Sequence, residues 1–188
     1  MAINSKLLNR CKKGDEKAYY ELYNLCFSDL MSICVRYYKH QEDSNSSLNK
    51  AFLRIVQNLD KYQEKVPWDR WIKKIMLNVI INEYKSNQKR KDTFTLTDYS
   101  DSFVFDSMSY NDIIESINVE HIKSFIHELP DTHKQVFNLY AIDGYAHKEI
   151  ADMLEIPLGT SKWLLSEARK QLKSKVEASM KITREVAS

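Results

Sequence analysis

The scarcity of glycine and proline is the strongest constraint on how this chain can fold. Only 3 Gly and 3 Pro occur in 188 residues. Glycine supplies the left-handed conformations of tight turns and proline interrupts helices, so a chain with few of both favours long helices over short hairpins. Apolar residues make up 43% of the chain, which is enough for a packed core. The sequence therefore predicts an all-α fold.

Apolar residues recur every three or four positions along most of the chain, as on the buried face of an amphipathic helix. The pattern is clearest over residues 68–86, where Pro67 suits the helix start. Pro130 and Gly144 are expected to end two later helices. The expected helices are two within 6–37 and one each over 48–62, 68–86, 114–129, 131–142, 147–154 and 160–181.

Charge divides the chain into three blocks. Residues 1–91 carry 18 Lys/Arg against 10 Asp/Glu, residues 92–112 carry 5 Asp and no basic residue, and residues 113–188 carry 10 Lys/Arg against 11 Asp/Glu. The middle block has no helical period and is rich in Ser, Thr, Asp and Asn. We therefore expect two small helical domains, 1–91 and 113–188, joined by an acidic flexible linker over 92–112.

Several classes of protein are disfavoured. No apolar run approaches the length of a membrane span, and the first residues show no signal peptide, so we expect a cytoplasmic protein without a membrane partner. The cysteines lack a paired metal spacing and are expected to be reduced thiols. No Gly-rich phosphate loop or nucleophile motif is present. We therefore expect no enzyme activity, cofactor, metal or small-molecule substrate.

The segment YAHKEIADMLEIPLGTSKWLLSEARKQLK, residues 145–173, has helix-turn-helix proportions. It is expected to lie in a four-helix second domain. One hypothesis is that its last helix enters a DNA major groove, and the alternative is a packing motif with a solvated basic face. The expected core residues are Ile150, Ala151, Leu154, Ile156, Leu158, Leu165, Ala168 and Leu172. The expected outward residues are Thr160, Trp163, Glu167, Lys170 and Gln171, with Lys162 and Arg169 beside them.

A second basic surface is expected on the helix over 68–86. Amides and cations on one helix face suit a nucleic-acid backbone and unpaired bases. Trp68 and Trp71 fall on the apolar stripe, so we favour a core position for them over base stacking. The candidate DNA-binding residues of this helix are Arg70, Lys73, Lys74, Asn78, Asn82 and Lys85.

In their order along the chain, these features resemble the extracytoplasmic-function (ECF) sigma factors, which direct RNA polymerase to promoters. The resemblance rests on three segments: KKGDEKAYYELYNLC, WDRWIKKIMLNVIINEYKSNQKR and LPDTHKQVFNLYAIDGYAHKEIADMLEIPLGTSKWLLSEARKQL. It implies that the first domain binds the clamp of the polymerase core and helps to open the −10 element. It also implies that the linker threads towards the RNA path and that the second domain reads the −35 element.

The family's residue roles transfer to matching positions here. The −10 role falls on Asn78 with its basic neighbours Lys73 and Lys74, and the loop over 61–66 corresponds to the segment that captures a flipped −10 base. The residues that the resemblance implies for the −35 element are Thr160, Ser161, Lys162, Arg169 and Lys170, with Trp163 beside them. Those expected to bind polymerase are Leu48, Asn49, Phe52, Leu53 and Val56.

Two departures from the family pattern keep other functions open. A Gln-Glu pair of the clamp-binding helix is Asn49 and Lys50 here, and Trp163 and Glu167 stand where small and basic residues are common. One alternative is a free-standing helix-turn-helix regulator that binds DNA as a dimer. The other is a degenerate sigma-like module that binds an anti-sigma protein, which is also a candidate partner of a working sigma factor.

Overall fold

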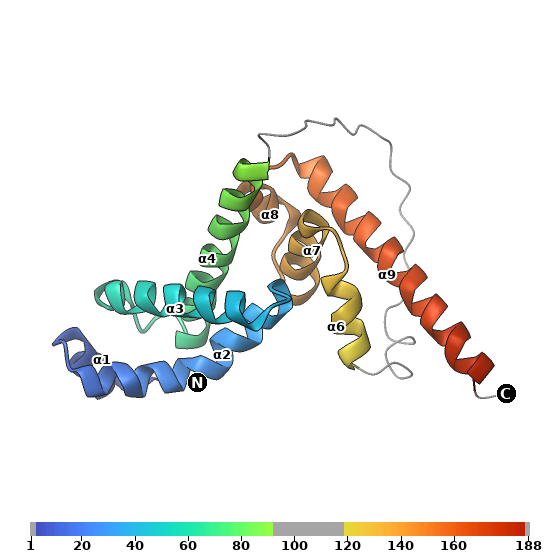
Figure 1. Ribbon diagram of the computed structural model, residues 1–188. Coiled ribbons are helices and arrows are strands. Elements are labelled where there is room, and N and C mark those ends of the chain that lie inside the picture. The colour runs from blue at the N-terminus through green and yellow to red at the C-terminus, as the bar shows by residue number, and fades with distance from the viewer. Residues whose placement is uncertain (1–2, 92–118, 187–188) are drawn as a thin grey trace. The chain divides into compact units, whose positions relative to one another are not determined.

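The computed structural model describes residues 3–91 and 119–186, and every regular element within these ranges is a helix (Figure 1). This confirms the all-α prediction. The chain folds into two compact units, Met1–Thr93 and Phe94–Ser188. The expected linker over 92–112, and the start of the helix expected from Ile114, lie outside the described residues. No helix in the described ranges is long and apolar enough to cross a membrane.

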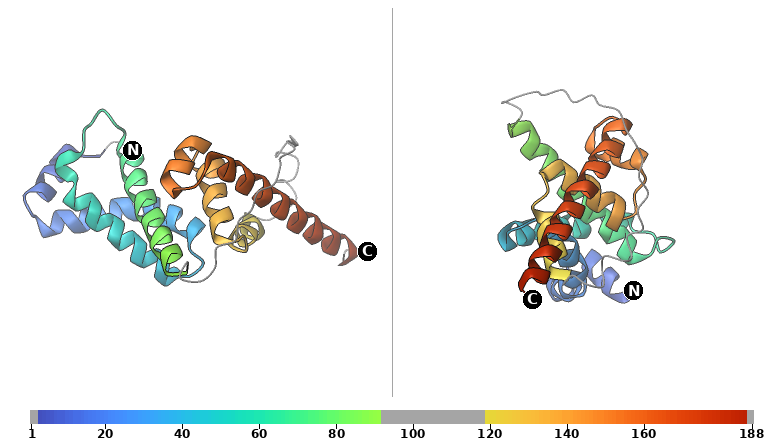
Figure 2. Two further views of the ribbon diagram at one scale, coloured as in Figure 1. Left: turned by 90° about the horizontal axis from the view of Figure 1, so that it is seen from above. Right: turned by 90° about the vertical axis from the view of Figure 1, so that its right-hand side faces the viewer.

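The first unit is built on three long helices that pack against one another (Figure 2). Its buried apolar side chains come from all of them, and from a short first helix that packs on the second. The elements are α1 (Ser5–Lys12), α2 (Glu16–Tyr37), α3 (Gln41–Gln57), the 3-10 turn η1 (Leu59–Lys61) and α4 (Trp68–Lys91).

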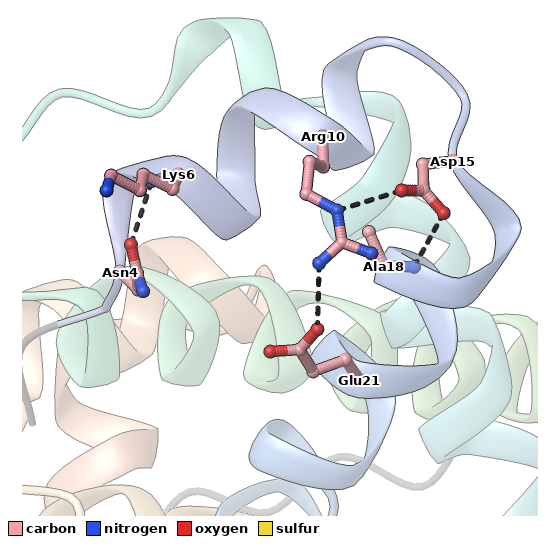
Figure 3. Close-up of polar contacts among 6 residues, drawn as sticks. All are labelled: Asn4, Lys6, Arg10, Asp15, Ala18 and Glu21. Atoms are coloured by element: carbon pink, nitrogen blue, oxygen red, sulfur yellow. Dashed lines mark hydrogen bonds and ion pairs between the residues drawn. The ribbon is translucent and has the colours of Figure 1, made fainter.

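Polar contacts cap both α1 and α2 and hold the turn between them (Figure 3). At the start of α1, the Asn4 side chain accepts from the backbone N–H of Lys6 at 2.9 Å. At the start of α2, the Asp15 carboxylate accepts from the N–H of Ala18 at 3.1 Å, and Arg10 donates to Asp15 at 2.8 Å and to Glu21 at 3.1 Å (Figure 3). The contacts of Asp15 and Arg10 hold the tight turn between the two helices, where Gly14 has φ +81°.

Helix α3 begins at Gln41, seven residues before the expected start, so that prediction was wrong. Acidic residues in the first turn, Glu42 and Asp43, favour a helix N-terminus at this position. Ser44 and Ser47 are buried at 1% exposure each, because their small side chains let α3 approach its neighbours closely. A polar run can therefore lie within a packed helix when its buried members are small.

The apolar stripe of α4 supplies much of the first core. Trp68, Ile72 and Met76 are buried, as are Val79 and Ile80 one turn further on, as the sequence predicts. The three cysteines are free and buried, and burial raises the pKa of Cys26 and of Cys34 to about 12. They therefore remain thiols at neutral pH.

Glu83 ties α4 to α3 and to the end of α2. Its carboxylate accepts from the hydroxyls of Tyr38 and Ser47, and from Lys50 Nζ at 2.8 Å. Burial opposes its ionisation, but the hydrogen bonds from Lys50, Ser47 and Tyr38 outweigh that cost and hold the pKa of Glu83 below its usual value. Glu83, the one acidic residue of α4 after Asp69, is thus a structural anchor.

The second unit packs a long last helix across three shorter ones. Leu129, Val136, Leu139, Ile150, Ala151, Leu154, Leu165, Ala168 and Leu172 form its buried core. Leu158 was expected in this core but is 46% exposed, and Ile156 is only half-buried. The elements are α6 (Val119–His127), α7 (Asp131–Phe137), the π-helical turn η2 (Asn138–Ile142), α8 (His147–Leu154) and α9 (Leu158–Val186).

We predict that Glu83→Gln lowers the free energy of unfolding by about 2 kcal/mol, because Lys50 loses its charged partner. Since the pKa of Glu83 is depressed in the folded chain, its contribution is complete above the unfolded value, about 4.3, and is lost as pH falls through the folded value. Urea unfolding at several pH values measures both effects. Glu42→Gln, at an exposed position of α3, is the control and should change stability by under about 0.5 kcal/mol. Equal effects of the two substitutions would contradict the anchor role.

Candidate nucleic-acid interface

The basic face expected on α4 is exposed. Arg70, Lys74, Asn78 and Asn82 are exposed, and Lys73 and Lys85 are half-buried. The apolar stripe of the helix is turned to the core, so these side chains are left on the surface of the unit. The arrangement offers cations and amide groups along one side of a rigid helix, which suits a nucleic-acid backbone and unpaired bases.

An aromatic cluster lies at the start of α4. The rings of Trp68 and Trp71 are 5.2 Å apart, and Tyr62, from the loop before the helix, lies 5.0 Å from the first and 5.1 Å from the second. Trp68 is buried at 5% exposure, as expected, whereas Trp71 and Tyr62 are half-buried. The cluster therefore has one buried ring, Trp68, and two rings that reach the surface. These two lie at the loop that is expected to capture a flipped nucleobase.

The helix-turn-helix forms from α8 and α9. Helix α8 spans His147–Leu154, the range expected from the sequence. Glu149 caps the N-terminal end of this helix, because its carboxylate accepts from the backbone N–H of Ala146 at 2.8 Å. Glu155 ends the helix in the left-handed conformation, with φ 58° and ψ 42°. This residue turns the chain towards α9, in the position where glycine is usually favoured.

Ser161 does not face DNA, and the prediction that it does was wrong. Its side chain is fully buried, and its hydroxyl is hydrogen-bonded to His147 Nδ1 at 3.0 Å. Thr160, next to it, is half-buried at the start of α9. The Ser161 hydroxyl links α9 to α8, because it is hydrogen-bonded to His147 at the start of α8.

The exposed side of α9 is rotated from the side expected. Lys162, Ser166, Arg169 and Lys173 are exposed and follow spacings of four, three and four, which place them along one side of the helix. Lys170 is also exposed. Sequence reasoning missed Ser166 and Lys173, although basic residues at 162, 169 and 173 share a helical period. We call Lys162, Ser166, Arg169 and Lys173 the basic row.

Trp163 and Glu167 lie outside the basic row. Trp163 is half-buried, with its ring 5.6 Å from that of His133 on α7. Glu167 is half-buried near the same histidine and lies 3.9 Å from Lys170. Trp163, expected beside the DNA-contacting residues, therefore packs against α7 within the protein. Glu167 likewise lies on a different side of α9 from Lys162 and Arg169.

A third surface covers neighbouring sides of α2 and α3. Tyr23 donates to Asn49 Oδ1 at 3.1 Å, and its ring packs edge-on against Phe52 at 5.0 Å. Around them Leu53 is 57% exposed and Tyr20 is 71% exposed. Exposed apolar groups gathered in this way make the surface a candidate protein interface. We call Tyr20, Tyr23, Phe27, Asn49, Phe52, Leu53 and Val56 the α2–α3 surface.

Leu48 does not belong to that surface, which corrects its expected role in binding polymerase. It has no exposed area, because it lies on the side of α3 that faces the core with Ala51 and Ile55. Lys50, the departure from the family pattern, is paired with Glu83 across the α3–α4 contact. Its charge is therefore balanced inside the unit.

Comparison with known proteins shows which family the chain resembles. The family model described as "Sigma-70, region 4" matches residues 121–172. The chain is 26% identical over 179 residues to the ECF RNA polymerase sigma factor SigW of Bacillus subtilis, covering 91% of this chain and 95% of that protein. It is 25% identical over 179 residues to the ECF RNA polymerase sigma-E factor of Escherichia coli K12, covering 91% and 93%. The chain is therefore similar to ECF sigma factors over about nine-tenths of its length.

The fold of the chain is shared with a solved sigma factor. The sigma factor RpoE of Bartonella quintana, crystallised with the anti-sigma factor NepR, aligns with 86% of this chain and 98% of its own, at 15% identity and a TM-score of 0.53. ECF sigma factors are not a family of enzymes. Among the residues that the structure describes, no group of three or more His, Cys, Asp or Glu is arranged to hold a metal ion.

We predict that Glu155→Gly stabilises the chain by about 1 kcal/mol, because glycine adopts the left-handed turn without the steric cost borne by other residues. Asp152→Gly, at an exposed position inside α8, is the matched control and should destabilise by about 1 kcal/mol. Thermal unfolding of the full chain distinguishes the two. Destabilisation by Glu155→Gly would show that the Glu155 side chain makes a contact worth more than the backbone strain.

Proposed function

We propose that this chain binds the RNA polymerase core through the α2–α3 surface, opens the −10 element with α4 and reads the −35 element with α9. The observation that carries the proposal is the presence of an exposed basic helix face in each of two units of an ECF sigma factor. A free-standing regulator needs one DNA-reading helix per subunit, whereas promoter opening and promoter reading need two surfaces.

The departures from the family pattern do not argue against this function. Lys50 is neutralised by Glu83, so the charge reversal at the expected clamp contact is partly cancelled within the chain. Glu167 lies beside His133 and Lys170, away from the Lys162–Arg169 side of α9. The reasons to regard the chain as a degenerate module are therefore weakened.

The division of roles on α4 follows from its geometry. Asn78 and Lys74 lie one turn apart on the exposed side, so one residue can contact a base while the other neutralises a phosphate. Tyr62 and Trp71 lie at the N-terminal end of the helix and offer ring faces on which an unpaired base can stack. We assign this end of the unit to single-stranded −10 DNA.

We predict that Leu53→Glu weakens binding to core polymerase by at least about tenfold, because it places a charge in an apolar contact. Leu25→Glu is the control, since Leu25 is 40% exposed and lies on a different side of α2 from Tyr20 and Phe27. Competition for fluorescently labelled core measures both. Equal losses would remove the α2–α3 surface from the interface.

We predict that Asn78→Ala slows open-complex formation by about tenfold while leaving core binding unchanged, because a base-directed amide contact is lost. Asn87→Ala is the matched control. Asn87 is also exposed on α4, but it lies nine residues on, half a turn round the helix. Permanganate reactivity of promoter thymines follows strand opening. If the Asn87→Ala variant opened the promoter as slowly as the Asn78→Ala variant, the face of α4 that we assign to DNA would be wrong.

A further inference from the structure

Three planar groups meet where η2, α8 and α9 converge. The ring of Tyr140 stacks on that of His147, with centroids 4.5 Å apart and planes inclined by 25°. The guanidinium carbon of Arg169 lies over the Tyr140 ring, 5.6 Å from its centroid. His147 Nδ1 is in turn hydrogen-bonded to the buried Ser161 hydroxyl at 3.0 Å. The stack therefore runs from the inside of the motif to Arg169 in the basic row.

The backbone explains why Tyr140 reaches this position. Residues Asn138–Ile142 form a π-helical turn, in which the N–H of Asp143 donates to the carbonyl of Asn138 at 2.9 Å. The N–H of Tyr145 donates to the carbonyl of Leu139 at 2.9 Å. Such turns occur often at functional sites, because the extra residue re-aims side chains. Here Leu139 stays fully buried while Tyr140 is 36% exposed.

The stack restrains a side chain that is otherwise mobile. A free arginine loses rotamer entropy when it binds a phosphate, and an aromatic face that already orients the guanidinium reduces that loss. His147 suits the inner end of the stack as a neutral ring. Burial lowers its pKa, and the charges of Lys162 and Arg169 lower it further, so it adds no third cation beside Arg169 at pH 7.

We propose that Tyr140 and His147 are positioning residues, which hold the Arg169 guanidinium ready for a phosphate of the DNA backbone. The proposal deepens the proposed function, because it rests on α9 facing DNA. It assigns a role to two residues outside the recognition helix. In this role the tyrosine contributes its ring face and the histidine supports that ring from below, through Ser161.

A double-mutant cycle tests the proposal with the full chain and a short mixed-sequence DNA duplex at low salt, followed by fluorescence anisotropy. Arg169→Gln should reduce the slope of log affinity against log salt by about 1, the value for one phosphate contact. Tyr140→Leu should weaken binding about threefold in the wild-type chain and have no effect beside Arg169→Gln. Tyr140→Phe keeps the ring and should restore wild-type affinity.

Two further variants guard against a purely structural effect. Ile142→Ala changes an exposed side chain of the same turn and should leave affinity unchanged. His147→Ala should act like Tyr140→Leu, and it replaces that variant in the cycle if circular dichroism shows that Tyr140→Leu does not fold. Three results would overturn the positioning role. Tyr140→Leu could weaken DNA binding equally with and without Arg169, or it could leave DNA binding unchanged. The third result is that the wild-type chain does not bind the duplex.

The outcome is separable from that of the proposed function. The cycle uses no polymerase, so a non-additive result stands even if the chain fails to bind core. Core binding with an additive cycle would keep the sigma function and remove the stack from DNA recognition.

Discussion

Burial of one side of α4 against α2 and α3 is the interaction on which the first unit depends. Trp68, Ile72 and Met76 lie in the core, so the opposite side, with Lys74 and Asn78, is exposed by the same packing that stabilises the unit. A helix held in this way presents its polar side chains at fixed positions. The exposed basic side of α4 is therefore a consequence of core packing.

Glu83 is the polar counterpart of this packing. It is half-buried on a basic helix, where an unpaired carboxylate would be costly. Tyr38 satisfies it from the end of α2, and Ser47 and Lys50 satisfy it from α3. Because Lys50 is used in this way, the family departure at this position has a structural explanation in the same helix pair.

The same principle orients α9 in the second unit. Leu165, Ala168 and Leu172 are buried and fix the rotation of the helix, which leaves Arg169 and Lys162 exposed. The stack of Tyr140 and His147 then adds to the exposed side a restraint that begins outside α9. The surface that we propose for DNA recognition is thus shared by η2, α8 and α9.

Helical period predicted the elements well, and it predicted the exposed side of α4, because that helix has a wide apolar stripe. It failed where small polar residues are buried. Helix α3 begins at Gln41 because Ser44 and Ser47 are buried within its first turns. Ser161 is buried in the helix-turn-helix, although serine is usually found on the surface. The π-helical turn that aims Tyr140 has no signature in residue spacing, so the stack was beyond sequence reasoning.

We expect this chain to select promoters for RNA polymerase. The most direct measurement mixes the purified chain with core polymerase from its own host, selects bound DNA from a random library and sequences the transcripts that the recovered fragments support. We expect transcription from fragments that share two sequence elements at a constant separation, and only when the chain is present. Fragments that show a palindromic site, or transcripts that do not depend on the chain, would contradict it.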